Sequence, residues 1–339
     1  MNFSSTTPTT HDSPMTLDQA RQIGDRLRAR MRDHVKGRDE VIELVLVSLL
    51  AGGHILLEDY PGSGKTTLAK SLGESIIDDK PHDDIAAFRR IQFTPDLLPS
   101  DITGVMVFDT DTNTFQFRFG PIFAHVVLVD EINRTSPKVQ AALLEAMAEK
   151  QVTVDNFSHK LDELFFVIAT QNPMDVAGTY PLPVAQIDRF LFKVRMQHVD
   201  RKSELEVLET WGTPKPPCTL PKVHRNEIIH VRETLRAKIH VAQIMKECLV
   251  DTARLLRDDK RVLQGVSTRS LVQAIPALQT IALLRNRDYV SSEDLEYLLP
   301  FLLHHRLELI PGAEDSTSII MAAAAKPLET LSCSTLRSQ

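Results

Sequence analysis

The stretch from His54 to Leu72 most constrains what this chain can fold into. It reads His-Ile-Leu-Leu-Glu-Asp-Tyr-Pro-Gly-Ser-Gly-Lys-Thr-Thr-Leu-Ala-Lys-Ser-Leu, an apolar run followed by a glycine-containing turn and a helix-favouring segment. A strand, a tight loop and a helix in this order are typical of a phosphate-binding loop. The loop residues that we expect to bind a nucleotide are Asp59, Pro61, Gly62, Ser63, Gly64, Lys65, Thr66 and Thr67.

The residue types in this loop suit phosphate binding. Gly62 and Gly64 allow backbone N–H groups to approach phosphate oxygens, and Lys65 adds a positive charge for the β- and γ-phosphates. The Thr66 hydroxyl can ligate Mg²⁺, so ATP and Mg²⁺ are the expected cofactors. The usual pattern has a glycine six residues before the lysine, where this chain has Asp59. The strand before the loop and the helix after it still favour a nucleotide site over a chance turn.

Composition narrows the class of protein. A length of 339 residues predicts two domains, and 42% hydrophobic with 25% charged residues is ordinary for a globular chain. The formal charge of −6 argues against a surface built throughout for nucleic acid. Three widely spaced cysteines indicate free thiols in a reducing compartment. Because the sequence has neither a secretory signal nor a long apolar run, we expect a cytoplasmic protein without a membrane span.

The chain divides by composition and periodicity. Residues 1–15 are rich in Ser, Thr and Pro and are expected to be disordered, and 16–198 form an α/β core with an N-terminal helix. Residues 199–313 form a smaller helical domain without strands, with a proline-rich linker near 212–222. Residues 314–339 are predicted to be a mobile tail. The basic residues of the N-terminal helix are expected to form a solvated face.

Polar side chains follow two apolar runs within the core. Residues 124–129 are a continuous β-branched run that ends in Asp130 and Glu131, and 164–169 precede Asn172. Such runs are typical of strands buried in a parallel sheet, whose carboxyl ends bind ligands. Asp130 can hold Mg²⁺ through its water shell, and Glu131 can polarise a water for attack on the γ-phosphate. Asn172 can orient that water, although as a lone residue it is equally well explained as part of a turn.

Two hairpins and one loop are predicted around these strands. Alternating apolar residues around a polar turn indicate a hairpin over 104–119, and a similar pattern indicates another over 151–162. The segment 94–101 contains two prolines and is expected to be a loop.

Three further stretches carry a family resemblance. They are Asp130-Glu-Ile-Asn-Arg134, Ala169-Thr-Gln-Asn-Pro173 and Gly178-Thr-Tyr-Pro-Leu-Pro183. Judged by the order and spacing of these motifs, the chain resembles a MoxR-type AAA+ ATPase over about residues 35–310. The resemblance implies a P-loop core in which helices flank a parallel five-stranded sheet, followed by a smaller all-α lid domain.

The resemblance also implies a role for each motif residue. From the residues alone, Arg189 and Arg269 are equally well explained as surface arginines. Guanidinium groups do stabilise the charge that develops on a transferred phosphate, and a neighbouring subunit sometimes supplies them. The implied roles are Walker A for Gly62, Gly64, Lys65 and Thr66, Walker B for Asp130 and Glu131, sensor 1 for Asn172, arginine finger for Arg189 and sensor 2 for Arg269.

Two departures from the family pattern stand out. The family commonly has Glu where this chain has Val184, so any contact of that carboxylate is in doubt. Asp59 at the first Walker glycine occurs in some relatives and is expected only to adjust the turn. By the same resemblance, the hairpins over 104–119 and 151–162 point toward the central face of a ring.

The implied function is that of a chaperone-like ATPase. Such a protein assembles into a ring, expected to be a hexamer, and remodels, activates or assembles protein partners, often ones with von Willebrand factor A domains. The alternatives are a nucleic-acid motor, a metal-chelatase motor subunit and a non-hydrolysing nucleotide switch. The first hairpin carries Asp109 and Asp111 against the single Arg118, and the second carries only His159 and Lys160, so neither suits phosphate tracking.

Overall fold

The computed structural model describes residues 14–58, 62–78, 84–173, 178–210, 218–313 and 315–337. Several predictions from the sequence therefore lie outside the described residues. They concern residues 1–13 of the N-terminal segment, Asp59 and Pro61 of the loop, and 212–217 of the linker.

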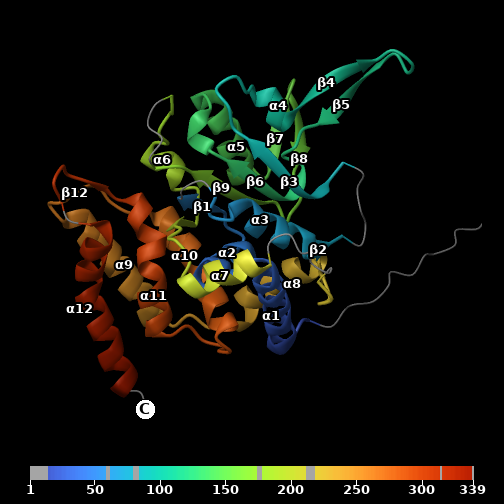
Figure 1. Ribbon diagram of the computed structural model, residues 1–339. Helices are drawn as coiled ribbons and strands as arrows, with labels where there is room; N and C mark the ends of the chain where they lie inside the picture. Colours follow the sequence, from blue (N-terminus) through green and yellow to red (C-terminus); the bar gives the residue numbers. More distant parts are fainter. Residues whose placement is uncertain are drawn as a thin grey trace, which may run out of the picture.

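A five-stranded, wholly parallel sheet forms the centre of the core, as predicted. Its middle strands have apolar side chains on both faces, since helices cover both sides of the sheet. Figure 1 shows α5 on one side and α2 and α3 on the other. In spatial order the strands are β10 (Phe192–Arg195), β1 (Ile55–Glu58), β9 (Phe166–Gln171), β6 (Ala124–Asp130) and β3 (Ala86–Gln92).

Alternate residues of the three middle strands, β1, β9 and β6, belong to two separate hydrophobic clusters. In β6, Val126 and Leu128 belong to one cluster, whereas Val127 and Val129 belong to the other. The strand is buried along its whole length. The helices of the core are α1 (Leu17–His34), α2 (Asp39–Ala51), α3 (Lys65–Glu74), α4 (Pro99–Thr103), α5 (Pro137–Glu149) and α6 (Val184–Ile187), with a 3-10 turn η1 (Ile132–Arg134).

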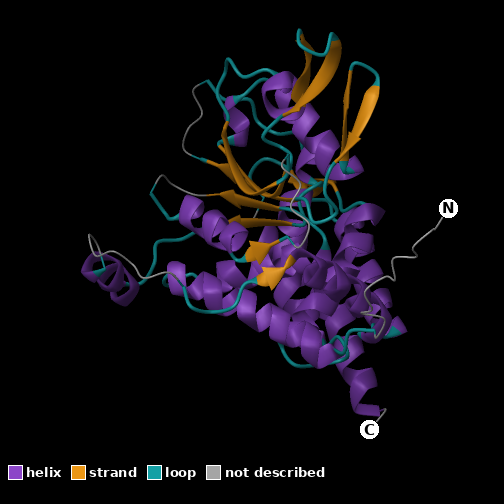
Figure 2. Ribbon diagram, turned by 90° about the vertical axis from the view of Figure 1, so that its right-hand side faces the viewer, coloured by secondary structure: helices purple, strands orange, loops and turns teal. Residues whose placement is uncertain are grey.

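Two hairpins project together from one end of the core, in agreement with the sequence prediction (Figure 2). The ring of Phe117 in the first stacks on His159 in the second, with centroids 3.7 Å apart. The hairpins are therefore joined to each other as well as to the sheet. Their strands are β4 (Gly104–Asp109) with β5 (Thr114–Phe119), and β7 (Gln151–Val154) with β8 (Phe157–Lys160).

The prediction of a loop over 94–101 is only partly correct, because the chain turns helical at Pro99. Proline suits the first helical position, where no N–H donor is needed. The Asp101 carboxylate accepts a hydrogen bond from the Leu98 N–H at 2.8 Å, which satisfies a group at the helix start.

The helical part after the core, which we call the lid, packs on the core through α1 and α2, both of which contact α8 and α10. Apart from α7 (Arg201–Glu209), which precedes it, the lid consists of α8 (Arg225–Lys238), α9 (Gln243–Asp258), α10 (Thr268–Leu284), α11 (Ser292–Leu303), η2 (His304–Arg306) and α12 (Ser316–Arg337). The prediction of no strands is wrong in detail, since β11 (Val223–His224) pairs with β2 (Ile76–Ile77) and β12 (Val262–Gln264) pairs with β13 (Glu308–Leu309).

The predicted mobile tail is wrong for Ser316–Arg337, which form α12. Ile319, Ile320 and Ala324 are fully buried, and the helix packs against α9 and α11. Its apolar residues are unevenly spaced and interrupted by Pro327, so the sequence shows no clear helical period. Its order depends on burial against partners that are distant in sequence.

The solvated basic face predicted for α1 is also only partly observed. Arg30 is buried and donates from Nε to the Ser75 hydroxyl at 3.0 Å. Arg26 forms an ion pair of 2.6 Å with Glu227 of α8. These long side chains lie along neighbouring elements instead of extending into water. Within the described ranges, no helix is both long and apolar enough to cross a bilayer.

If α12 is an integral part of the lid, truncating a buried side chain there should destabilise the protein. We expect Ile320→Ala to lower the free energy of unfolding by about 2–5 kcal/mol, because it leaves a cavity. Thermal unfolding measures the effect, with the exposed Glu329→Ala as the matched control on the same helix. Equal melting temperatures for both variants would contradict the packed arrangement.

Candidate functional site

The loop after β1 has the backbone that a phosphate site requires. Gly62 and Gly64 have φ of 87° and 90°, in the left-handed region that glycine tolerates without a steric penalty. Gly64 is the N-cap of α3, which begins at Lys65. Among the described residues, a Cβ added to either glycine would meet nothing within 4 Å. The helix start and its N–H groups thus face a site that can receive an anion.

Arg38 supports this loop, a role that the sequence did not reveal. The residue is only 8% exposed, and its Nη2 approaches the Ser63 carbonyl oxygen at 3.4 Å. Its Nη1 donates to the carbonyl oxygen of Gln197, just beyond β10. The guanidinium therefore joins the phosphate loop to the chain that leads toward α7. Arg38 is the N-cap residue of α2, and its place among the basic residues that follow α1 gave no signal of this role.

Asp130 lies at the carboxyl end of β6, where its predicted role requires it. Its carboxylate accepts from Arg90 Nε at 2.6 Å and from the Thr170 hydroxyl at 3.3 Å. Arg90 comes from β3 and Thr170 from β9, the strands on either side of β6. An acidic group flanked in this way stays ordered, and its oxygens are of the kind that Mg²⁺ prefers.

Glu131 follows in a strained backbone conformation, with φ of 57°. Its N–H donates to the Thr170 hydroxyl at 2.9 Å. The carboxylate accepts from Gln92 Nε2 at 3.0 Å and pairs with Arg134 Nε at 3.1 Å. Gln92 and Thr170 were missed from the sequence, although Thr170 directly follows the predicted strand 164–169; Gln92 is the last residue of β3. Together these partners fix the direction of the Glu131 carboxylate.

Asn172, Lys65 and Thr66 lie at the same edge of the sheet as the two carboxylates. β9, which ends one residue before Asn172, lies between β6 and β1 in the sheet. Parallel strands bring their carboxyl ends together, so the loop after β1 and the amide after β9 adjoin Asp130. The predicted nucleotide-site residues among those described are thereby gathered at one edge, apart from the two arginines.

Arg189 and Arg269 lie at the opposite edge. The N–H of Leu191 donates to the carbonyl of His54 at 2.8 Å, just before β1 begins, whereas the phosphate loop follows the end of β1. A strand of this length spans about 13 Å. Arg189 itself donates to the Leu144 carbonyl oxygen of α5. Arg269 stands in the first turn of α10, whose Ser270 hydroxyl bonds to Asp188 at 2.7 Å. Both arginines thus stand on segments that meet before β10, whereas the phosphate loop follows β1.

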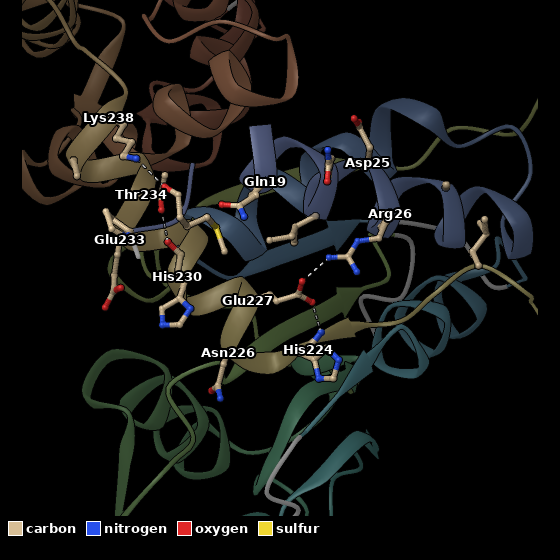
Figure 3. Close-up of a pocket in the computed structure, with 17 residues that line it drawn as sticks. Gln19, Asp25, Arg26, His224, Asn226, Glu227, His230, Glu233, Thr234 and Lys238 are labelled. Atoms are coloured by element: carbon tan, nitrogen blue, oxygen red, sulfur yellow. Dashed lines mark hydrogen bonds and ion pairs between the residues drawn. The ribbon is translucent and has the colours of Figure 1, made fainter. Parts of the chain in front are cut away.

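A large groove of about 1470 Å³ lies elsewhere, between α1 and α8. Figure 3 shows Arg26 and Glu227 paired across it, with His224 and His230 on the same side. None of the predicted nucleotide-site residues lines this groove. It is therefore a separate feature of the core–lid junction.

Comparison with known proteins agrees with this geometry. The family described as "ATPase family associated with various cellular activities (AAA)" matches residues 54–192, and an "AAA lid domain" matches 254–326. The protein YeaC of Bacillus subtilis is 46% identical over 279 residues, which are 82% of this chain and 84% of that protein.

Two further proteins are similar to this chain, one with a named activity and one with a solved structure. The chaperone MoxR1 of Mycobacterium tuberculosis is 35% identical over 284 residues, covering 81% of this chain and 73% of that protein. A crystal structure of a protein from Cytophaga hutchinsonii, assigned as an ATPase, superposes with a TM-score of 0.81 at 32% identity, covering 91% of this chain and 96% of that one. With its five-stranded nucleotide-binding core and helical lid, the chain belongs to the MoxR-type AAA+ ATPases.

Proposed function

We propose that this ATPase works as a ring, with hexamer the expected size, whose active sites lie between adjacent subunits. One observation carries the proposal: the phosphate loop and carboxylates lie at one edge of the sheet, while Arg189 and Arg269 lie at the other. This separation favours assigning both arginines to the nucleotide of another subunit. In a ring, they would act on the nucleotide of the neighbour.

Within one subunit, we assign the chemistry to the residues at the carboxyl edge. Lys65 and the loop N–H groups bind the phosphates, and Asn172 orients the attacking water. Thr66 and Asp130 would hold Mg²⁺, which neutralises charge on the phosphates. Glu131 accepts a proton from that water. Gln92 and Arg134 both contact its Oε2 and hold the carboxylate in place. Because the arginines are proposed to come from the neighbour, hydrolysis by the isolated chain is expected to be slow.

The hairpins support a protein client. Phe115 and Phe157, near their tips, are 66% and 64% exposed. Exposed aromatic side chains suit contact with other proteins. The acidic Asp109 and Asp111 beside them would repel a phosphate backbone, which disfavours the nucleic-acid motor. We therefore infer that the protein remodels or activates protein partners, and a von Willebrand factor A domain is the client class that the family resemblance suggests.

The assigned base can be tested directly. Glu131→Gln should bind ATP as tightly as the natural chain but hydrolyse it about 10²- to 10⁴-fold more slowly, because the amide cannot accept the proton. Phosphate release and equilibrium binding of a fluorescent ATP analogue measure the two properties. Glu145→Gln, an exposed glutamate of α5, is the control and should change neither. Unimpaired turnover in Glu131→Gln would refute this assignment.

An active site shared between two subunits predicts how mixtures of variant subunits behave. Arg189→Ala alone should lose about 10³-fold or more of the turnover while still binding ATP. Adding Glu131→Gln subunits, which keep their arginines, should restore hydrolysis at the intact sites of Arg189→Ala. The exposed Arg32→Ala should behave like the natural chain. Full activity of Arg189→Ala in a strictly monomeric sample would rule out the shared site.

The exposed side chains of Phe115 and Phe157 near the hairpin tips should contribute to client binding but not to nucleotide binding. In the Glu131→Gln background with ATP, the double substitution Phe115→Ser and Phe157→Ser should lower the yield of co-purified client while ATP affinity stays unchanged. Both side chains are exposed, so folding should be little affected. Salt-sensitive DNA binding with DNA-stimulated hydrolysis would instead favour a nucleic-acid motor.

A further inference from the structure

The lid holds the backbone on both sides of Arg189. The carbonyl oxygen of Phe190, which follows it, accepts from Arg306 Nη2 at 2.9 Å and is hydrogen-bonded to His305 Nε2 at 3.1 Å. The carbonyl of Asp188, which precedes it, lies 3.4 Å from the same Arg306 nitrogen. Both His305 and Arg306 belong to η2 of the lid. The backbone that carries Arg189 is therefore held by the lid as well as by the core.

The Asp188 carboxylate is the centre of this contact. It pairs with Arg306 Nε at 2.9 Å and accepts from the hydroxyls of Ser270 at 2.7 Å and Ser267 at 3.2 Å. The Arg306 side chain is only 1% exposed and also donates to Gln273 of α10 at 2.8 Å. Burial lowers the pKa of Arg306 to about 10, which still leaves it charged at neutral pH. A buried charge of this kind needs its partner, so Asp188 and Arg306 act as a unit.

The same carboxylate also fixes Arg269. Ser267 is the N-cap of α10, and Arg269 stands between it and Ser270, so both hydroxyls that bond to Asp188 flank Arg269. One acidic side chain of the core thus anchors the first turn of α10 and the segment that carries Arg189. Arg269 is close enough to Arg306 for their charges to interact.

We propose that Asp188 and Arg306 are positioning residues that aim Arg189 and Arg269 together at the neighbouring subunit's nucleotide, so that the position of one lid controls hydrolysis in the adjacent site. This inference rests on the proposed shared site. The competing explanation is that the pair only fastens the lid to the core. In that case its loss would lower stability but would not affect the neighbour.

Asp188→Asn tests the proposal. Because a misdirected arginine stabilises the transferred phosphate poorly, we expect kcat to fall roughly 10- to 100-fold while the affinity for a fluorescent ATP analogue stays within about twofold. Mixing with Glu131→Gln subunits should restore turnover, since these supply correctly aimed arginines to the intact Asp188→Asn sites. The mixture of Arg189→Ala with Glu131→Gln, measured in parallel, reports the shared site itself.

Asp294→Asn is the matched control. Asp294 is a fully buried lid aspartate that pairs with Arg287 at 2.6 Å and Arg285 at 3.1 Å, and its loss should destabilise the lid without lowering kcat. If Asp188→Asn does not fold, Arg306→Lys and Ser270→Ala replace it, because they weaken the contacts of Asp188 but keep its charge and that of residue 306. Each should lower kcat while the affinity for the ATP analogue stays unchanged.

The outcomes separate the two proposals. If Glu131→Gln subunits restore ATP turnover to Arg189→Ala but not to Asp188→Asn, the positioning role is overturned and the shared site stands. Restoration in neither would overturn both. Equal loss of kcat in Asp188→Asn and Asp294→Asn would show that the pair is only structural.

Discussion

Parallel pairing of β1 with β9 and β10 is the constraint on which the rest of the structure depends. Because the three strands run in one direction, the segments that follow β1 and β9 meet at the carboxyl edge of the sheet. The segment that precedes β10 lies at the amino edge. The phosphate loop and Asn172 belong to the first group, and Arg189 belongs to the second. The strand order thereby separates the groups to which we assign nucleotide binding from the arginine that we propose completes the site of a neighbour.

At each edge of the sheet, an ion pair with one buried member holds this arrangement. At the carboxyl edge, Asp130 is paired with Arg90. At the amino edge, Asp188 is paired with Arg306. An ion that is removed from water without a partner is strongly destabilising, so each pair fixes the relative position of the elements that carry it. The same physics that stabilises the fold therefore orients the groups on which catalysis depends.

Much of the core could be predicted, because its signals are local. The apolar run 124–129, ended by two carboxylates, indicated a buried strand and its chemistry without reference to any distant residue. The missed features depend on tertiary partners. The order of α12 depends on α9 and α11, and the role of Arg38 depends on carbonyl oxygens of Ser63 and Gln197 that are remote in sequence. Gln92 could have been suspected from its place at a strand end, but its bond to Glu131 requires the sheet order.

The stacking of Phe117 on His159 has a mechanical consequence. The first hairpin runs directly into β6 and the second into β9, and those two adjacent strands end at Asp130 and beside Asn172. A force on either hairpin would therefore be shared through the stacked rings and would act on two hydrogen-bonded strands. The far ends of these strands carry Asp130 and lead to Asn172, the residues to which we assign metal binding and phosphate sensing, so a force on a client-bound hairpin would act on the same strands that lead to the proposed nucleotide site.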